Sequence, residues 1–315
     1  RSYVGQWLAS HGGSLEASFV LQSWLNAGGE RELVGSYVGQ WLASNGGLPE
    51  SQFVLKSWLD AGGERELVRA YVGQWLEIYG EDDESDFVMR AWLQSGGEFA
   101  LVRSPAERWL RAHREAPEAV HITKFLAKET DLPSESVSDI LVWCRKFHSN
   151  EDALWRLTSL GAKLLKPELS DEVVAASRPV LETALRSSRL ERQALVTLLF
   201  AKLGRAPELR ARVAELFATW LRTPGSLDFA MAENPGALGL KAQQPSLLYY
   251  LRDLVEAHAL DLTRDREVLQ RLFNWVVRWP PEKSTQAREI LANLSAPSGA
   301  GNSGAPAPAA PQPAA

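Results

Sequence analysis

The sequence predicts an all-α protein, an α-solenoid of helical hairpins that continues into an irregular helical half and ends in a flexible tail of proline and alanine. Three observations predict this fold. Tryptophans recur at one interval, apolar residues follow helical spacing, and glycine pairs separate the helical stretches. Apolar and polar residues do not alternate with the period of two that is typical of strands. We place the regular array at residues 1–147, the irregular region at 148–295 and the tail at 296–315.

The spacing of the tryptophans defines the period of the array. Every interval is 17 residues in the series Trp7, Trp24, Trp41, Trp58, Trp75, Trp92 and Trp109. Residues 2–35 and 36–69 are identical at 26 of 34 aligned positions, so the repeat has 34 residues and two related halves. Repeats of this kind bury a continuous core by stacking on their neighbours. Recent duplication would produce the same near-identity, so both origins remain open.

Each half of the repeat predicts one amphipathic helix. In the first half, apolar residues form one wide helical stripe, made of Leu33, Val34, Tyr37, Val38, Trp41 and Leu42. The first copy contains the corresponding Tyr3, Val4, Trp7 and Leu8. The second half has Phe53, Val54, Trp58 and Leu59, followed 34 residues later by Phe87, Val88, Trp92 and Leu93. We therefore expect these side chains, and above all the tryptophans, to be buried between stacked hairpins.

Glycine pairs are expected to end the helices. They follow the tryptophans by four to six residues, where glycine readily adopts the left-handed conformation, at Gly12-Gly13, Gly28-Gly29, Gly46-Gly47, Gly62-Gly63 and Gly96-Gly97. Acidic residues then open the next helix near its partially positive N-terminus, at Glu30, Glu32, Glu64 and Glu66. Gly5, Gly39 and Gly73 lie inside predicted helices, where we expect a neighbouring helix to approach closely.

The pattern weakens after residue 110. Trp109 keeps the phase, Leu126 takes the next tryptophan position, and Trp143 lies 34 residues after Trp109. Further helices are predicted without the period, at residues 170–187, 189–204, 207–222, 244–259, 263–280 and 282–294. A segment rich in glycine and proline, residues 223–246, interrupts them and is predicted to be a hinge or a binding loop. Residues 296–315 have the composition of a flexible linker.

Composition restricts the partners. The net charge is −5, and residues 1–103 carry 7 Lys and Arg against 14 Asp and Glu, a net charge of −7. The rest carries 27 against 25, a net charge of +2. An acidic array disfavours nucleic acid as a partner. The single cysteine, Cys144, and the lack of an 18-residue apolar run predict a cytoplasmic protein without a membrane span. Because the chain starts at Arg1 inside a repeat, we expect it to be part of a longer protein.

Varied polar positions on the constant frame are the candidate contact residues for a partner. One position follows the first-half tryptophan by four residues and holds His11, Asn45, Tyr79 and His113. A second position, in the second predicted helix, holds Gln22, Lys56 and Arg90, and a third holds Asn26, Asp60 and Gln94. Repeat proteins diversify a ligand-facing surface in this way. Drift on a solvated face produces the same picture, and the residues alone leave that alternative open.

Motifs for catalysis, cofactors or metals are missing. The phosphate-loop motif GxxxxGK[ST], HExxH and GxSxG do not occur. The loop with Glu81, Asp82, Asp83, Glu84 and Asp86 lacks the spacing of an EF-hand. Cys144 and His148 are four residues apart, but a cysteine beside Trp143 in an apolar stripe is more typical of a core. The most basic stretch contains Arg108, Arg111, Arg114, Lys124 and Lys128, with interleaved glutamates. We therefore predict no enzyme and no cofactor.

The stretch FVLKSWLDAGGERELVRAYVGQWL, residues 53–76, resembles tandem helical repeats in the C-terminal regions of large bacterial proteins, notably STAND-type NTPases and related defence or signalling proteins. The resemblance covers roughly the first 110 residues. It implies a sensor or scaffold module coupled to effector or NTPase domains that lie outside this chain. The repeat length also equals that of the tetratricopeptide repeat and of TAL effector repeats, but the tetratricopeptide motif and the basic character of TAL effectors are absent.

Together these features predict a segment that binds a protein or peptide and serves as the sensor or scaffold of a larger bacterial signalling or defence protein. The alternative is a nucleic-acid-binding repeat protein that uses Arg108, Arg111 and Arg114. A third alternative is an enzyme that uses residues 223–246 with Asp228 and Glu233.

Overall fold

The computed structural model describes residues 3–187, 189–222, 249–250, 252–253, 265–276, 284–285, 288–289 and 292. Throughout this described part the regular structure is helical, as predicted. The chain divides into two compact units, Arg1–Ser187 and Ser188–Ala315. The predicted loop at residues 223–246, with Asp228 and Glu233, and the predicted tail at 296–315 lie outside the described residues.

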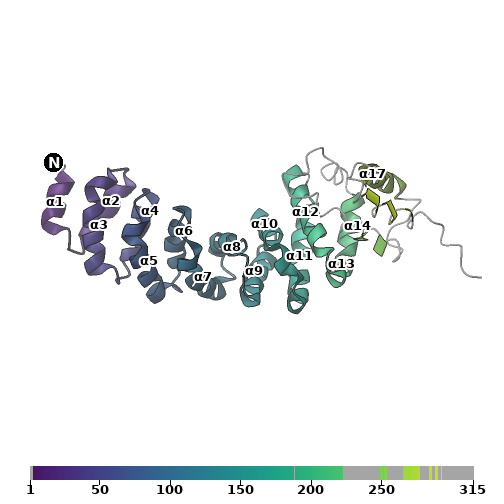
Figure 1. The fold of residues 1–315 in the computed structure, drawn as a ribbon, viewed down its shortest axis with the longest axis horizontal. Coiled ribbons are helices and arrows are strands. Elements are labelled where there is room, and N and C mark those ends of the chain that lie inside the picture. Colours follow the sequence, from purple (N-terminus) through teal and green to yellow (C-terminus); the bar gives the residue numbers. More distant parts are fainter. Residues whose placement is uncertain are drawn as a thin grey trace, which may run out of the picture. The chain divides into compact units, whose positions relative to one another are not determined.

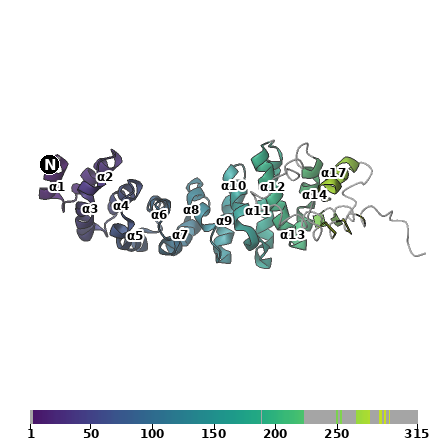
Figure 2. The same ribbon diagram turned by 45° about the horizontal axis from the view of Figure 1, so that its top comes forward.

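The first unit contains pairs of antiparallel helices (Figures 1 and 2). They are α1 (Tyr3–His11), α2 (Ala17–Asn26), α3 (Arg31–Asn45), α4 (Ser51–Asp60), α5 (Arg65–Tyr79), α6 (Ser85–Gln94) and α7 (Phe99–His113), then the short η1 (Pro117–Ala119), α8 (Val120–Leu126), α9 (Ser134–Lys146) and α10 (Glu151–Leu160). In both views α2, α4, α6, α8 and α10 form one row, and each packs on the next; α3, α5, α7 and α9 form a second row in the same way. The predicted boundary at residue 147 marks where the sequence period ends, and it stays a prediction. The first compact unit of the structure extends further, to Ser187.

Two short 3₁₀ turns and one long helix complete the first unit. They are η2 (Gly161–Leu165), η3 (Pro167–Leu169) and α11 (Ser170–Leu185), which packs on α9. The second unit contains α12 (Leu190–Leu203), α13 (Pro207–Arg212), α14 (Ala214–Arg222) and α17 (Arg266–Val276). The single helix predicted over residues 207–222 is wrong, because the backbone leaves helical geometry at Val213, with φ −118° and ψ 10°.

The tryptophans of the first unit pack as predicted. Five of the phased residues, Trp41, Trp58, Trp75, Trp92 and Trp109, are almost completely buried, and so is Trp143. Trp7 and Trp24 are only half-buried, because no hairpin that the structure describes covers the outer side of α1 and α2. An aromatic side chain of this size removes about 150–250 Å² from water, so these rings dominate the core.

The two tryptophans of each hairpin form different hydrogen bonds. Indole Nε1 groups in the row of α3, α5, α7 and α9 donate to a loop carbonyl of the preceding hairpin: Trp41 to Ser14 O at 2.8 Å, Trp75 to Leu48 O at 3.1 Å, Trp109 to Asp82 O at 2.9 Å and Trp143 to Ala116 O at 3.1 Å. In the other row Trp24, Trp58 and Trp92 each donate at 3.0 Å to the carbonyl of the residue that opens the next helix, namely Glu30, Glu64 and Glu98. One tryptophan therefore connects hairpins and the other positions the next helix.

The glycine pairs also have two roles, which corrects the prediction that all of them are left-handed. Gly28, Gly62 and Gly96 have positive φ values of 75°, 73° and 83°, as predicted. Gly46 has φ −60° and Gly12 is not among the positive-φ glycines. At Gly12 and Gly46 the reason for glycine is close approach, since a Cβ at Gly46 would lie 2.8 Å from Tyr71 Cδ1.

The prediction that a neighbouring helix closely approaches the glycines inside helices is correct for two of the three. A Cβ at Gly39 would lie 3.0 Å from Leu67 Cδ1 and one at Gly73 would lie 3.1 Å from Leu101 Cδ1, which is the close helix approach that we expected. The corresponding distance from Gly5 to Leu33 Cδ1 is 3.7 Å, an ordinary contact.

Three aromatic residues assigned to the buried stripe are exposed instead. The exposed fractions are 83% for Tyr3, 45% for Phe53 and 40% for Phe87. Tyr3 has no preceding hairpin to pack on in the described part of the chain, whereas its equivalents Tyr37 and Tyr71 lie against Gly12 and Gly46. The two phenylalanines are exposed because they lie on the side of the helix that faces away from the buried residues.

Candidate binding surface on the first compact unit

The first set of predicted contact residues is engaged within the fold. His11 and His113 stack on the tryptophans four residues before them, with ring centroids 4.7 and 4.4 Å apart. Asn45 Nδ2 donates to Trp41 O at 3.0 Å, and Tyr79 OH donates to Gly47 O of the preceding hairpin at 3.0 Å. His113 Nε2 lies 2.8 Å from Asp83 Oδ1. Tyr79 and His113 therefore contact the preceding hairpin, whereas the contacts of His11 lie within its own helix. The role of all four residues in partner binding stays a prediction.

The second set, Gln22, Lys56 and Arg90, lies on α2, α4 and α6 and is half-buried. Lys56 Nζ pairs with Asp60 Oδ2 of the same helix at 2.6 Å. The Arg90 guanidinium lies over the ring of Phe87, 5.1 Å from its centroid. These three side chains therefore border a row of exposed aromatic residues.

We name this row the aromatic ladder and define it as Phe19, Phe53, Phe87, His121 and Trp155. The five positions are 34 residues apart and lie on α2, α4, α6, α8 and α10. Phe19, Phe53, Phe87 and Trp155 are 66%, 45%, 40% and 47% exposed. Burial lowers the pKa of the His121 imidazole. Four of the five positions therefore hold large exposed apolar side chains, while His121, between Phe87 and Trp155, is half-buried.

Sequence reasoning missed the ladder because the apolar stripe of the second helix is wider than the face that is buried. At 100° per residue, Phe53 lies about 140° from Trp58 around the helix axis. The buried residues Val54, Leu55 and Leu59 surround Trp58 on the opposite side from Phe53. Placing the apolar residues on a helical wheel centred on the tryptophan would have separated Phe53 from the core.

An acidic residue precedes every rung of the ladder by three positions. These residues are Glu16, Glu50, Glu84, Glu118 and Asp152. Glu16, Glu50 and Glu84 are the N-cap residues of α2, α4 and α6, where the helix dipole stabilises a negative charge. Asp152 pairs with Arg156, whereas the four glutamates form no ion pair with Lys or Arg in the part of the chain that the structure describes. The ladder is therefore bordered by open carboxylates.

A polar cavity of about 600 Å³ lies at the opposite end of the same helices. The end of α4, the start of α5 and the end of α6 line it. Asp60 and Gln94, two of the varied residues, are part of this lining together with Glu64 and Arg65. The varied positions therefore border both the ladder and this cavity.

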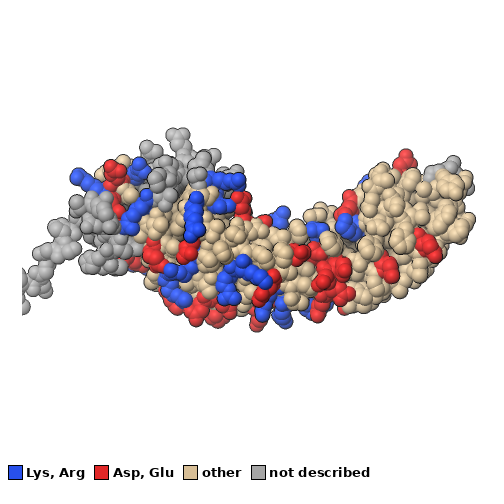
Figure 3. Space-filling view, turned by 180° about the vertical axis from the view of Figure 1, so that it is seen from behind, with Lys and Arg blue, Asp and Glu red and all other residues tan. Residues whose placement is uncertain are grey.

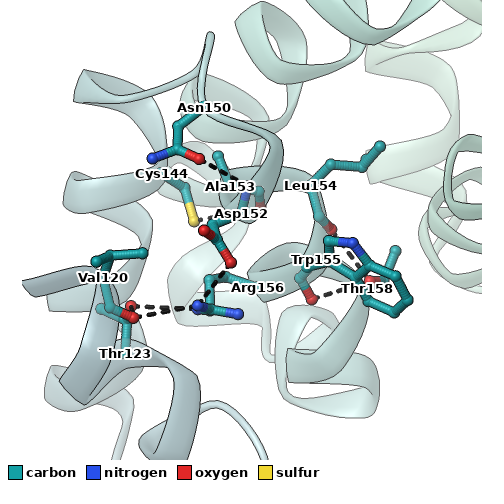
Figure 4. Close-up of polar contacts among 10 residues, drawn as sticks. All are labelled: Val120, Thr123, Cys144, Asn150, Asp152, Ala153, Leu154, Trp155, Arg156 and Thr158. Carbon is teal, nitrogen blue, oxygen red and sulfur yellow. Dashed lines mark hydrogen bonds and ion pairs between the residues drawn. The ribbon is translucent and has the colours of Figure 1, made fainter. Parts of the chain in front are cut away.

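Arg156 connects α10 with α8, the two helices that carry the last two rungs of the ladder (Figure 4). It is buried and replaces the aliphatic residue that follows each earlier rung, such as Val54 or Ile122. Its Nη2 donates to Val120 O at 3.1 Å and to Asp152 Oδ1 at 2.9 Å, and its Nε lies 3.3 Å from Thr123 Oγ1. Burial lowers the pKa of the Arg156 guanidinium, and Asp152 opposes that effect. These bonds hold α10 against α8.

The cysteine beside this cluster is not activated. Burial raises the pKa of the Cys144 thiol well above its usual range, and Sγ donates to Ala153 O at 3.6 Å (Figure 4). His148 instead lies with Nδ1 3.1 Å from Thr183 Oγ1. The structure therefore does not bring Cys144 and His148 together as a nucleophile and its base.

Carboxylates from neighbouring elements pair with the arginines of the basic stretch. Arg108 pairs with Glu81 at 3.2 Å, and Arg114 pairs with Asp139 at 2.8 Å. Arg111 Nε lies 3.9 Å from the same Asp139. Lys124 and Lys128 are exposed. Because the acidic loop supplies Glu81 to Arg108 and Asp83 to His113, its carboxylates point to different partners.

No protein-family model, no curated protein and no solved structure matches the chain. Among the described residues, no helix is both long enough and apolar enough to cross a membrane.

Proposed function

We propose that residues 1–147 form an α-solenoid of 34-residue hairpins and that the chain binds a protein or peptide, as a sensor or scaffold segment of a larger bacterial signalling or defence protein. The solenoid is supported by equivalent hydrogen bonds at 34-residue spacing, such as those of Trp41, Trp75, Trp109 and Trp143. Each helix also packs on its counterpart in the next hairpin.

The binding function is supported mainly by the aromatic ladder. Phe19, Phe53, Phe87 and Trp155 have their rings in solvent although a buried position lies one residue away on the same helices. Exposure of such residues opposes folding and solubility, since buried apolar surface contributes about 25 cal/mol per Å². A binding partner that covers the row accounts for its presence. By contrast, Arg108 and Arg114 are already paired, and this observation disfavours nucleic acid.

Selection from a random peptide library displayed on phage tests the function. The full chain is the target, and selected peptides are measured again on two variants. Phe53→Ser combined with Phe87→Ser removes two rungs. Ile78→Ser is the matched control, because Ile78 is 57% exposed but lies on α5 in the other row. We expect enriched peptides that lose affinity for the ladder variant and keep it for the control. No enrichment, or equal binding to all three proteins, would contradict the proposal.

A further inference from the structure

We infer that the aromatic ladder binds an extended basic peptide in the polyproline II conformation, with a cationic side chain at every third residue. This inference rests on the proposed function and adds the chemical class and the periodicity of the ligand. It follows from the spacing of the rungs, from the chemistry of the rings and from the charge beside them.

The spacing expected for side chains on successive packed helices matches one turn of polyproline II. The helices α2, α4, α6, α8 and α10 pack on one another in succession, and packed helices lie about 8–10 Å apart. A polyproline II helix has three residues per turn and a rise of about 3.1 Å per residue, so the same side is presented about every 9.3 Å. A β-strand presents the same side about every 6.7 Å, which does not match the rungs.

The rings select cations. The face of an aromatic ring attracts a guanidinium or ammonium group that lies within about 6 Å of its centroid. Arg90 of the protein itself lies in this way, 5.1 Å from the centroid of Phe87, so a ligand cation at that rung takes the place of Arg90. Proline side chains between the cations would pack on the remaining apolar edges, as in other aromatic grooves that recognise polyproline II.

The charge beside the ladder also favours a basic ligand. Glu16, Glu50, Glu84 and Glu118 form an open acidic edge, while Lys56 on the other edge is neutralised by Asp60. Residues 1–103 carry a net charge of −7. On the face shown in Figure 3, acidic side chains lie along the N-terminal part of the chain among mostly uncharged residues. A peptide with one cation per turn would place a positive charge near each ring and its neighbouring glutamate.

A fluorescence anisotropy titration of the full chain tests this inference. The probe is a fluorescein-labelled periodic peptide of five consecutive Arg-Pro-Pro units, with one arginine per turn for each of the five rungs. A clustered peptide, in which all the arginines precede all the prolines, has the same composition without the period, and a peptide of five Glu-Pro-Pro units reverses the charge. We expect the periodic basic peptide to bind about tenfold more tightly than the clustered one and the acidic peptide not to bind. Higher salt should weaken binding, because the glutamates are exposed.

Two sets of variants locate the site. Phe53→Ser with Phe87→Ser and, separately, Glu50→Gln with Glu84→Gln should each weaken binding of the periodic peptide about tenfold. Ile78→Ser should leave it unchanged. All the replaced side chains are exposed, and circular dichroism melts that match the parent chain verify that the variants fold.

Four results would overturn the inference. They are equal affinity for the periodic and clustered peptides, affinity that is insensitive to the ladder variants, a concentration-dependent dimer that the ladder variants abolish, and tighter binding after deletion of residues 296–315. The dimer would assign the ladder to a second copy, and the deletion result would assign it to that proline-rich segment. If library peptides bind through the ladder while the periodic basic peptide does not, the ligand class is wrong and the proposed function stands. If neither binds, both fail.

Discussion

At the scale of single residues, the glycine that packs against a tryptophan ring is the position where the hairpins least tolerate a larger side chain. A Cβ at Gly63 would overlap the indole ring of Trp58, whereas one at Gly13 would have no atom within 4 Å. Trp58 is buried and its indole donates to Glu64 O. The second glycine of the pair therefore makes room for the indole, and the first provides the left-handed turn.

Gly63→Ala should consequently destabilise the protein, and Gly13→Ala should not. Overpacking of a filled core costs about 1–3 kcal/mol, while a change at an open surface position stays within about 0.5 kcal/mol. Urea unfolding followed by circular dichroism measures both free energies of unfolding. Equal midpoints for the two variants would show that Trp58 can move aside without loss.

The buried carboxyl group of Asp86 should make the free energy of unfolding depend on pH in the direction opposite to that of most carboxylates. Burial raises the pKa of Asp86 to about 6 from 3.8, while nearby Arg90 and His113 oppose the shift and Glu118 supports it. A folded-state pKa above the unfolded one means that ionisation disfavours the folded state. The contribution of this group to stability therefore increases as the pH falls from about 7 to about 4.

The charge-removing variant isolates this contribution. Asp86→Asn should raise the free energy of unfolding at pH 7 by about 2–3 kcal/mol, because one pKa unit corresponds to about 1.4 kcal/mol. The difference between variant and parent should disappear below about pH 4, where Asp86 is protonated in both states. Urea midpoints measured at neutral pH and at successively lower pH provide the test. A difference that stays constant with pH would show that the carboxylate is not the cause.

Residue patterns predicted the core better than they predicted the surface. The tryptophan interval and the helical spacing identify Trp41, Trp58 and Trp75 as core residues, because packing is encoded by side-chain type and period together. Phe53 has the same kind of side chain and the same period, yet it is exposed. Whether an apolar side chain at the edge of a stripe is covered depends on neighbouring helices that are distant in sequence, and this information is absent from a local pattern.

At the scale of helices, α7 contains an irregularity that the earlier hairpins lack. Pro105 lies inside this helix at the position that holds Tyr37 and Tyr71 in the preceding copies. Proline removes one helical hydrogen bond and costs about 3 kcal/mol in a helix interior. Pro105 packs against Gly80, as those tyrosines pack against Gly12 and Gly46.

Pro105→Tyr should therefore stabilise the first unit. The variant restores the backbone N–H group and places a ring where the equivalent rings already fit beside glycine. We expect an increase of about 1–3 kcal/mol in the free energy of unfolding. Differential scanning calorimetry measures it, with Tyr71→Phe as a control for the hydroxyl group alone. A lower melting temperature would mean that the space beside Gly80 is too small for a ring.

Helix boundaries were predicted closely where glycine or a tryptophan repeat marks them, as at the end of α4. They were missed where the backbone alone interrupts a continuous apolar pattern, as at Val213 between α13 and α14. The candidate site shows the same limit. The varied residues Gln22, Lys56 and Arg90 lie on helices that carry the ladder, but the rings that they border were assigned to the core.

At the scale of the whole molecule, a stacked array tolerates the loss of one complete repeat but not of half a repeat. Deletion of residues 36–69 removes one complete repeat. Residue 35 then precedes Ala70 in place of its counterpart Arg69, so the helix continues in the same register. Deletion of residues 36–52 instead joins helices of different rows. We expect the first deletion to unfold cooperatively at a lower urea concentration and the second to lose that transition. Equal behaviour of the two deletions would contradict a 34-residue repeat.

The central claim is that the aromatic ladder acts as one continuous binding surface. Removing its aromatic side chains one after another tests this claim most directly. Phe19→Ser, Phe53→Ser, Phe87→Ser and Trp155→Ser are introduced singly and then cumulatively, and the equilibrium affinity for one library-selected peptide is measured for each protein. We predict a stepwise loss, about three- to tenfold for each rung that the peptide spans, with no change for Ile78→Ser. An affinity that stays constant as the rungs are removed would contradict the claim.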